Sequence, residues 1–458
     1  MSHYSSPRFT AGFGGLLFAL LTMVSLPGTA AADVKTQAGV LPDGSPWRID
    51  MPDNWNGAVL VNLDYAGGND MANNPRSRLL LERGYALAGT NRAKTGWNVK
   101  ASVENLAGVV KQFRELYGKA RLTLAFGQSL GGHTAFGAVE LRPDLFDGGV
   151  AMCGAPAGIV AMWNGKMDAL FIVRTLLAPG SNVPLIHYPA DQAKTVLPRW
   201  REVLEAAQRT PGGRARIALA ATLAQLPAWS VPSKQQPASS DDDALEDGLY
   251  DSLAAGPLPL LAQYGGSRFA LEQLGGGNFS FNTGVDYASN LHHLRGAQLV
   301  ERLYQKAGLN LRADLDALAS APRIAPEYEP IAALSYQIYG ARLKRPVITL
   351  HASGDQISPP DTTSALDLEL RAHHKQALVR QVYTNAAGHC PFSPAEVLAV
   401  TERLVHRIQS GRWEPTDAAT LNLLAASYAS GETRFIPYLP EPFLRPFGLR
   451  DLKSLATK

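Results

Sequence analysis

The chain has 458 residues, of which 46% are hydrophobic, and it carries a formal net charge of +3. This is enough apolar sequence for one large hydrophobic core, or for a core with a second lobe, and we expect two lobes. The 43 basic residues are interleaved with 40 acidic ones instead of being clustered. This charge pattern excludes the basic footprint of a nucleic-acid-binding protein, so no nucleic-acid partner is expected.

The first residues have the composition of a secretory signal. Arg8 precedes an apolar run at residues 13–26, and the small residues Ala30 and Ala32 that follow fit a cleavage site. The run is too short to cross a bilayer comfortably, so a retained membrane anchor is the less favoured alternative. We therefore predict a signal peptide at residues 1–32, cleaved near Ala32, with export to the periplasm or the exterior and no stable membrane anchor.

The mature chain begins with strand patterns. Residues 37–51 alternate loosely around a turn dipeptide at residues 43–44, which predicts a β-hairpin at the edge of a sheet. Residues 58–63 and 84–90 are short apolar runs of the kind found in strands buried on both faces. The helical spacing of apolar residues in 103–117 predicts an amphipathic helix.

The next stretch can hold one serine in an exposed turn. Residues 120–126 form an apolar strand pattern, and residues 131–141 have apolar positions at helical spacing. Ser129 lies in the tight turn between them. Gly127 and Gly131 remove the Cβ atoms that would collide where strand and helix nearly touch, so the serine is held out over the end of the sheet.

A further strand is predicted at residues 148–153, after which the alternation of strands and helices stops. The segment 155–343 is expected to be mainly helical, with helical spacing at residues 201–209, 215–226 and 290–307. We interpret as solvated loops the proline-rich residues 227–237, the acidic residues 241–243 and the glycine run 275–277. A helical insertion at this point would lie over the carboxyl edge of the sheet as a lid; the rival interpretation is an independent domain.

The sheet pattern resumes after the insertion. Strands are predicted at residues 346–351 and 378–383, the second being the last of the sheet, with a helix at residues 362–372 between them. Ser393 is expected to cap a helix that ends near residue 408. Strands that alternate with helices predict an α/β fold, in which a mostly parallel sheet has helices on both faces. Residues 411–458 receive no predicted role.

The Gly-x-Ser-x-Gly pattern of residues 127–131, between a strand and a helix, resembles the nucleophile elbow of the α/β-hydrolase family. The alternative is a glycine-rich turn without chemistry. The resemblance is to serine esterases with a large helical lid, and it covers residues 37–154 and 344–410 but not the insertion. It implies a hydrolase core at 33–154 and 344–410, a cap at 155–343 and a C-terminal extension at 411–458.

Three residues follow the family's chain order of nucleophile, acid and histidine: Ser129, Asp355 and His389. Asp355 and His389 both come just beyond strand ends. A serine hydroxyl needs an imidazole to take its proton, and a carboxylate to fix the imidazole tautomer and stabilise its positive charge.

Competing histidines and acids are less well placed in the sequence. His133 lies one helical turn beyond the serine, and four other histidines lie in helical stretches typical of solvated surfaces, namely His292, His293, His373 and His374. Asp361 is expected to cap a helix, and Asp367 lies within that helix.

By the same resemblance, the backbone N–H groups of Leu130 and Tyr65 would form an oxyanion hole. The family's loop usually begins with His-Gly, whereas this chain has Leu63 and Asp64 at that point. The Tyr65 hydroxyl could also reach the site; the alternative is a loop tyrosine half-buried against the lid.

The chain has only two cysteines, Cys153 and Cys390. If the fold is as expected, Cys153 ends a strand and Cys390 adjoins the proposed base, so both lie on the rim of the site. Export implies an oxidising compartment, which favours a disulfide between them that would fix the His389 loop against the sheet. Two buried free thiols are the alternative.

These features predict an exported serine hydrolase that cleaves a carboxylic ester through an acyl-enzyme, with no metal or cofactor. A peptidase or amidase of the same fold, an acyltransferase and a non-catalytic binding protein are the alternatives. An apolar or aromatic small-molecule ester is the expected partner, because aromatic and apolar residues stand at the start of the lid and after its glycine run: Met162, Trp163, Phe171, Phe279 and Phe281. Packing within the lid is the alternative for each of them. Trp97, in the loop after the predicted strand at residues 84–90, is a further candidate for the pocket lining, with a packing role as its alternative.

Overall fold

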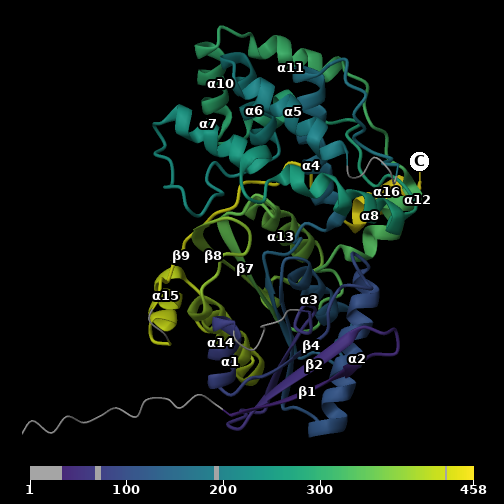
Figure 1. The fold of residues 1–458 in the computed structure, drawn as a ribbon, viewed down its shortest axis with the longest axis vertical. Coiled ribbons are helices and arrows are strands. Elements are labelled where there is room, and N and C mark those ends of the chain that lie inside the picture. Colours follow the sequence, from purple (N-terminus) through teal and green to yellow (C-terminus); the bar gives the residue numbers. More distant parts are fainter. Residues whose placement is uncertain (1–32, 68–73, 190–194, 429–430, 458) are drawn as a thin grey trace, which may run out of the picture.

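The computed structural model describes residues 33–67, 74–189, 195–428 and 431–457. The predicted signal peptide at residues 1–32 lies outside the described residues. The fold is organised around a nine-stranded sheet with the order β1-β2-β4-β3-β5-β6-β7-β8-β9 (Figure 1). The strands are β1 (Val34–Val40), β2 (Pro46–Pro52), β3 (Ala58–Asn62), β4 (Ala86–Gly89), β5 (Leu122–Gln128), β6 (Gly148–Met152), β7 (Val347–Gly354), β8 (Val379–Ala387) and β9 (Phe435–Ile436).

Neighbouring strands from β4 through β3, β5, β6 and β7 to β8 are parallel, whereas the β1–β2 hairpin at one edge and β9 at the other pair antiparallel. The predicted edge hairpin and the parallel sheet are thus confirmed. The carboxyl ends of the parallel strands share one edge of the sheet, where ligands bind in such folds.

Helices cover both faces of the sheet, as the alternation predicted. One face is packed by α2 (Val99–Tyr117), α3 (Leu130–Leu141) and α13 (Thr363–Ala372), and the other by α1 (Pro75–Glu82), α14 (Pro394–Ser410) and α15 (Ala418–Ala426). Ser393 caps α14 through a reciprocal pair of hydrogen bonds with Glu396, as expected for that position.

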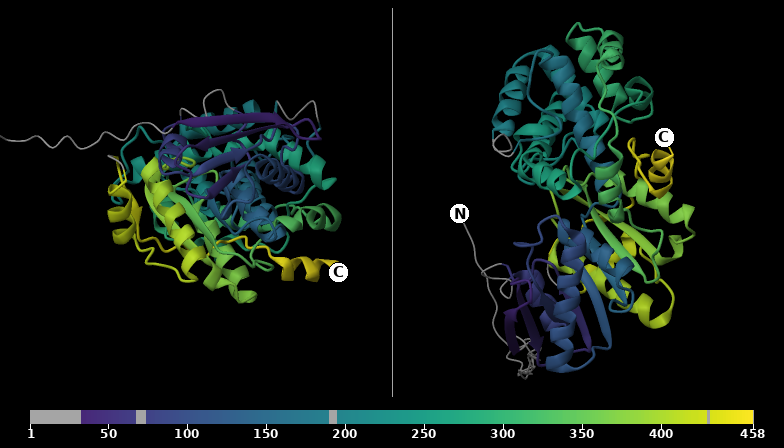
Figure 2. Two further views of the ribbon diagram at one scale, coloured as in Figure 1. Left: turned by 90° about the horizontal axis from the view of Figure 1, so that it is seen from below. Right: turned by 90° about the vertical axis from the view of Figure 1, so that its right-hand side faces the viewer.

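The segment between β6 and β7 is helical and lies over the carboxyl edge of the sheet (Figures 1 and 2). Its α-helices are α4 (Ile159–Leu177), α5 (Val196–Gln208), α6 (Pro211–Leu223), α7 (Asp242–Tyr250), α8 (Gly266–Gly275), α9 (Tyr287–His292), α10 (Ala297–Lys306), α11 (Leu311–Ser320) and α12 (Tyr328–Leu334). These helices share a hydrophobic cluster distinct from the two clusters that pack against the sheet.

Two details of the insertion differ from the sequence prediction. The single helix expected at residues 290–307 is two helices, because the chain turns before Gly296, where a side chain would meet Thr222 at 2.7 Å. The acidic run predicted as a loop starts α7 instead: the Asp241 side chain accepts from the Ala244 N–H. Carboxylates at a helix N-terminus are stabilised by the unpaired N–H groups and the helix dipole.

The C-terminal extension contains the largest departure from the prediction. The strand predicted at residues 378–383 is present as β8, which continues to Ala387, but it is not the last strand, because β9 pairs alongside it. After β9 the chain crosses to the insertion, where Arg445 donates to the buried carboxylate of Asp168 on α4. The last helix, α16 (Leu449–Ala456), lies against α12. The extension therefore ties the sheet to the helical insertion.

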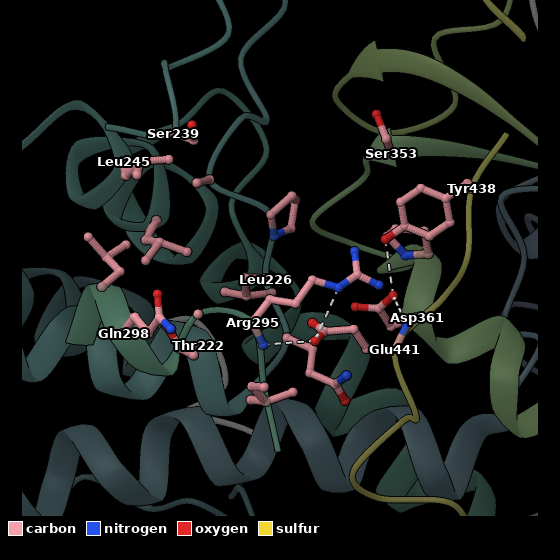
Figure 3. Close-up of a pocket in the computed structure, with 18 of the residues that line it drawn as sticks. Thr222, Leu226, Ser239, Leu245, Arg295, Gln298, Ser353, Asp361, Tyr438 and Glu441 are labelled. Carbon is pink, nitrogen blue, oxygen red and sulfur yellow. Dashed lines mark hydrogen bonds and ion pairs between the residues drawn. The ribbon is translucent and has the colours of Figure 1, made fainter. Parts of the chain in front are cut away.

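A second set of contacts made by the C-terminal extension surrounds Asp361, beside a cavity of about 440 Å³ (Figure 3). The Asp361 carboxylate accepts hydrogen bonds from the Tyr438 hydroxyl and the Glu441 N–H, and Glu441 pairs with Arg295 of the insertion. Asp361 is therefore not the helix cap expected from the sequence: its side chain is bonded to the extension, and α13 begins without a side-chain cap.

Replacing Asp361 by asparagine is expected to stabilise the protein at pH 7 and to leave it unchanged near pH 4. Burial raises the pKa of Asp361 to about 6, although bonds to the Glu441 N–H and Tyr438 partly oppose this. The pKa of this carboxyl is higher in the folded than in the unfolded protein. It therefore contributes stability below pH 4, and that contribution is lost as pH rises through 6. Asparagine keeps the accepting oxygen without the charge, and the gain is at most about 3 kcal/mol.

Urea unfolding of D361N and the wild type from pH 4 to 7 measures this difference. Asp367→Asn is the matched control, because Asp367 lies on the surface of α13 beside Arg371 and its loss should shift stability little. A difference between D361N and the wild type that does not change with pH would contradict the assignment.

Within the described residues, none of the helices combines the length and the apolar character that crossing a lipid bilayer requires.

Candidate active site

Ser129 occupies the strained turn that the sequence predicted between β5 and α3. Its backbone has a φ of 56° and a ψ of −128°, a conformation that costs free energy for a residue with a side chain. The turn is held by a hydrogen bond from the Ser129 N–H to the Met152 carbonyl on β6. A Cβ on Gly127 would lie 2.5 Å from the Gly131 backbone, so strand and helix can approach only with glycine there.

The glycines after the serine have different tasks from those predicted. A Cβ on Gly131 would face the loop after β3, at 3.3 Å from the Asp64 carboxylate. Gly132 is the tighter position, because its Cβ would lie 2.2 Å from the Met152 carbonyl. The close packing of α3 on the sheet therefore depends on Gly127 and Gly132.

The structure brings Ser129, His389 and Asp355 into one chain of hydrogen bonds. The Ser129 hydroxyl lies 2.8 Å from Nε2 of His389. Nδ1 of the same ring lies 2.8 Å and 3.0 Å from the two carboxylate oxygens of Asp355. Since a carboxylate only accepts, the Nδ1–H donates to Asp355 and leaves Nε2 free to accept the serine proton.

Asp355 is fully buried just beyond the end of β7 and is fixed independently of the histidine. Its Oδ1 accepts from the N–H groups of Ile357 at 2.9 Å and Ser358 at 2.8 Å. These two bonds hold the carboxylate in place with Oδ2 directed toward the imidazole.

None of the competing side chains is bonded to the side chain of Ser129 or His389, although His133 lines a cavity with both of them. The His133 ring is buried and bonded to Gln337 at 3.0 Å, and burial lowers its pKa to about 4, so it stays neutral. Asp367 pairs with Arg371 on α13. The other four competing histidines are exposed, as expected, but only His292 lies within a helix: His293 follows α9, and His373 and His374 follow α13.

Cys153 and Cys390 form the expected disulfide. It joins the end of β6 to the residue after His389, and the two sulfurs lie within 4.8 Å of ligand atoms of Asp355 and His389. The loop that carries the imidazole is thereby attached covalently to the strand beside the serine turn.

The Tyr65 side chain does not reach the site. Its ring is 2% exposed and packs in the core, and its hydroxyl donates to Asp50 on β2. Both sequence expectations for this side chain, contact with the site and half-burial against the lid, are therefore wrong. The loop after β3 nevertheless runs beside the first turn of α3, so the backbone N–H groups of Tyr65 and Leu130 stay the predicted oxyanion donors.

The sequence profile of the alpha/beta hydrolase fold matches residues 67–394. The chain belongs to the α/β-hydrolase family. It is 32% identical over 433 residues to the o-phthalyl amidase of Xanthobacter agilis, a match that covers 87% of this chain and 93% of that protein.

Solved structures with the α/β-hydrolase architecture are more distant. Feruloyl esterase B from Aspergillus oryzae has 16% identity and a TM-score of 0.37, covering 82% of this chain and 80% of that one. The cell-wall-degrading esterase LipA from Xanthomonas oryzae has 13% identity and a TM-score of 0.37, covering 84% and 92%. These likenesses add nothing to the family assignment.

In this α/β-hydrolase, a cavity of about 40 Å³ opens beside Ser129 and His389. Trp97, Met162 and Trp163 line it, together with Ile159 of α4. The other aromatic residues proposed for the substrate do not reach it, because they pack within the insertion and the extension: Phe171 against Tyr287, Phe279 against Trp163, and Phe281 against Phe447.

The sequence reasoning missed one charged residue of this cavity, Lys166 on α4. The helix is apolar on nearly all sides, so it has no amphipathic period and was not predicted. Ile159, Met162, Trp163 and Lys166 nonetheless follow one helical face. The signal that could have identified Lys166 is a single lysine on the apolar face of the helix that follows β6. The end of β6 borders the Ser129 turn, so that helix begins near the site.

Proposed function

We propose that this α/β-hydrolase is a serine hydrolase that cleaves a carboxylic acid derivative through an acyl-enzyme. The hydrogen-bonded chain from Asp355 through His389 to the Ser129 hydroxyl supports the proposal. Ser129 is the nucleophile, His389 the general base and then acid, and Asp355 the residue that orients the imidazole.

Ser129 Oγ attacks the acyl carbon while its proton moves to Nε2 of His389, and Asp355 stabilises the imidazolium. The leaving group takes that proton as its bond to the acyl carbon breaks, which gives the acyl-enzyme. A water molecule then attacks the ester with the same help from His389, and the acid is released. The N–H groups of Leu130 and Tyr65 would hold the oxyanion in both steps.

An amide is the better candidate for the bond cleaved, although the sequence alone favoured an ester. The observation that changes the preference is the 32% identical relative, which is named an o-phthalyl amidase. That name, and the tryptophans beside Ser129, support an aromatic acyl group in the substrate.

The domain roles belong to the same proposal. Residues 155–343 act as a lid over the site, while residues 33–154 and 344–410 are the hydrolase core. Residues 1–32 are a signal peptide for export to the periplasm or the exterior, and the disulfide between Cys153 and Cys390 is compatible with that oxidising destination.

A fluorophosphonate probe tests the nucleophile. We expect the wild type to be labelled and Ser129→Ala not to be labelled, because only an activated serine reacts at neutral pH. Ser320→Ala, at the exposed end of α11, is the control and should label as the wild type does. Labelling that persists in S129A would exclude Ser129 as the nucleophile.

Turnover of matched aromatic amides and esters with the same leaving-group size separates the two bond types. An added alcohol acceptor tests for acyl transfer, since a transferase would give the alkyl ester as the main product in place of the free acid.

A further inference from the structure

Lys166 is a buried ammonium group without an acidic partner. Its side chain is 5% exposed, and its Nζ donates to the Gln263 side-chain oxygen and lies 5.1 Å from the centroid of the Trp163 ring. Among the described residues, no carboxylate oxygen lies within ion-pair distance of it. A buried cation without a counter-ion is costly and gains much when an anion arrives.

Other buried charges of the insertion are neutralised by the protein itself. Asp168, two residues along α4, pairs with Arg445, and Arg268 pairs with Glu272. Lys166 differs from them because it is left with a neutral amide and an aromatic face. Its partner is therefore expected to come from outside the chain.

The position of Lys166 in the cavity beside Ser129 indicates what kind of partner this is. Lys166 and Gln263 line the same cavity as Ser129 and His389, and the cavity measures only about 40 Å³. One small acyl group can therefore reach both the nucleophile and the ammonium. The wall of the cavity includes Met162, whose flexible, unbranched side chain can move to admit an aromatic ring.

We propose that Lys166, assisted by Gln263, binds a carboxylate carried by the acyl group, so that the preferred substrates are half-amides or half-esters of an aromatic dicarboxylic acid. This inference rests on the proposed function and specifies its substrate class. Trp163 contributes a flat surface for the ring beside the ammonium, and the apolar lining of Ile159 and Ile357 excludes water from the ion pair.

The protonation of Lys166 gives the preference a pH dependence. Burial lowers the pKa of Lys166 to about 7, and the negative charge of Asp355 partly opposes that effect. The other titratable groups that line the cavity are His389 and His133, and the latter stays neutral. In the free enzyme the ammonium is lost as pH rises through 7, so the preference for a carboxylate should fall over that range.

The test compares two substrates with one leaving group, a benzoyl amide and its analogue with a carboxylate next to the scissile carbonyl. In the wild type we expect kcat/KM to favour the carboxylate by about 100-fold at pH 6, mainly through KM, since hydrogen bonds between charged groups have this magnitude. In Lys166→Met the ratio should fall to near one. Lys119→Met, which removes an exposed positive charge at the opposite end of β5, should keep the wild-type ratio.

A wild-type ratio near one, or an unchanged ratio in K166M, overturns the inference while hydrolysis of the benzoyl amide still supports the proposed function. Binding of free benzene-1,2-dicarboxylate and of benzoate, measured by calorimetry, needs no turnover. The dicarboxylate should bind the wild type at least about 10-fold more tightly than K166M. Equal affinities of the wild type and K166M for the dicarboxylate overturn the carboxylate site, even if neither substrate is hydrolysed. A wild type that the fluorophosphonate does not label contradicts the proposed function alone.

Discussion

Replacing Asp355 by asparagine is expected to lower kcat about 10⁴-fold while leaving the fold intact. In the wild type, Oδ1 accepts from the N–H groups of Ile357 and Ser358, and Oδ2 accepts from His389. Asparagine can keep the first two bonds only by placing its oxygen there, which turns its NH₂ toward the ring. The imidazole must then accept at Nδ1 and carry its proton on Nε2, so it can no longer take the proton of Ser129.

Asp361→Asn is the matched control, because it alters a second buried carboxyl that follows β7. The Asp361 carboxyl contacts the C-terminal extension and not His389. The kcat of D361N should stay within a few-fold of the wild type. Steady-state kinetics on one amide substrate, with circular dichroism to check folding, measures both variants. Full activity in D355N, or an equal loss in both variants, would mean that another group orients His389.

Removing the disulfide is expected to give the largest loss of stability. The bond joins residues 237 positions apart, and the chain-entropy model assigns such a loop about 5 kcal/mol, an upper value because native strain and residual structure reduce it. We expect the variant with both Cys153→Ala and Cys390→Ala to unfold at a much lower urea concentration. Its activity should also fall, since the sulfurs lie within 4.8 Å of His389 and Asp355.

The single variants separate the bond from the packing of its sulfurs. If the covalent link is what stabilises the protein, Cys153→Ala and Cys390→Ala should each lose as much as the double variant, because either change breaks the same bond. Losses in the single variants that add up to the loss in the double variant would instead assign the effect to side-chain packing.

The elements that could be predicted well from the sequence are those determined by neighbouring residues in the chain. The strand before Ser129 and the helix after it have clear sequence patterns, and the glycines around the serine indicate that the strand and helix backbones approach closely. Asp355 and His389 could be placed because parallel strands end at one edge of a sheet, whatever their separation along the chain.

The features that were missed depend on distant partners. The direction of the Tyr65 side chain is set by Asp50 on the edge hairpin, which no local pattern reveals. The strand β9 has only two residues and is held by its pairing with β8, too short for any alternation to appear. The helix α4 is buried on almost every side, so the apolar period that marks a surface helix is absent.

The contact between Arg445 and Asp168 also sets an order of events during synthesis. The arginine is made 277 residues after the aspartate whose charge it neutralises, and that aspartate lies on the same helix as Lys166. Until Arg445 has been made, Asp168 lacks its cationic partner, although the hydroxyl of Tyr287 can already donate to it. The contact that joins α4 to the C-terminal extension can therefore form only after residue 445 has been synthesised.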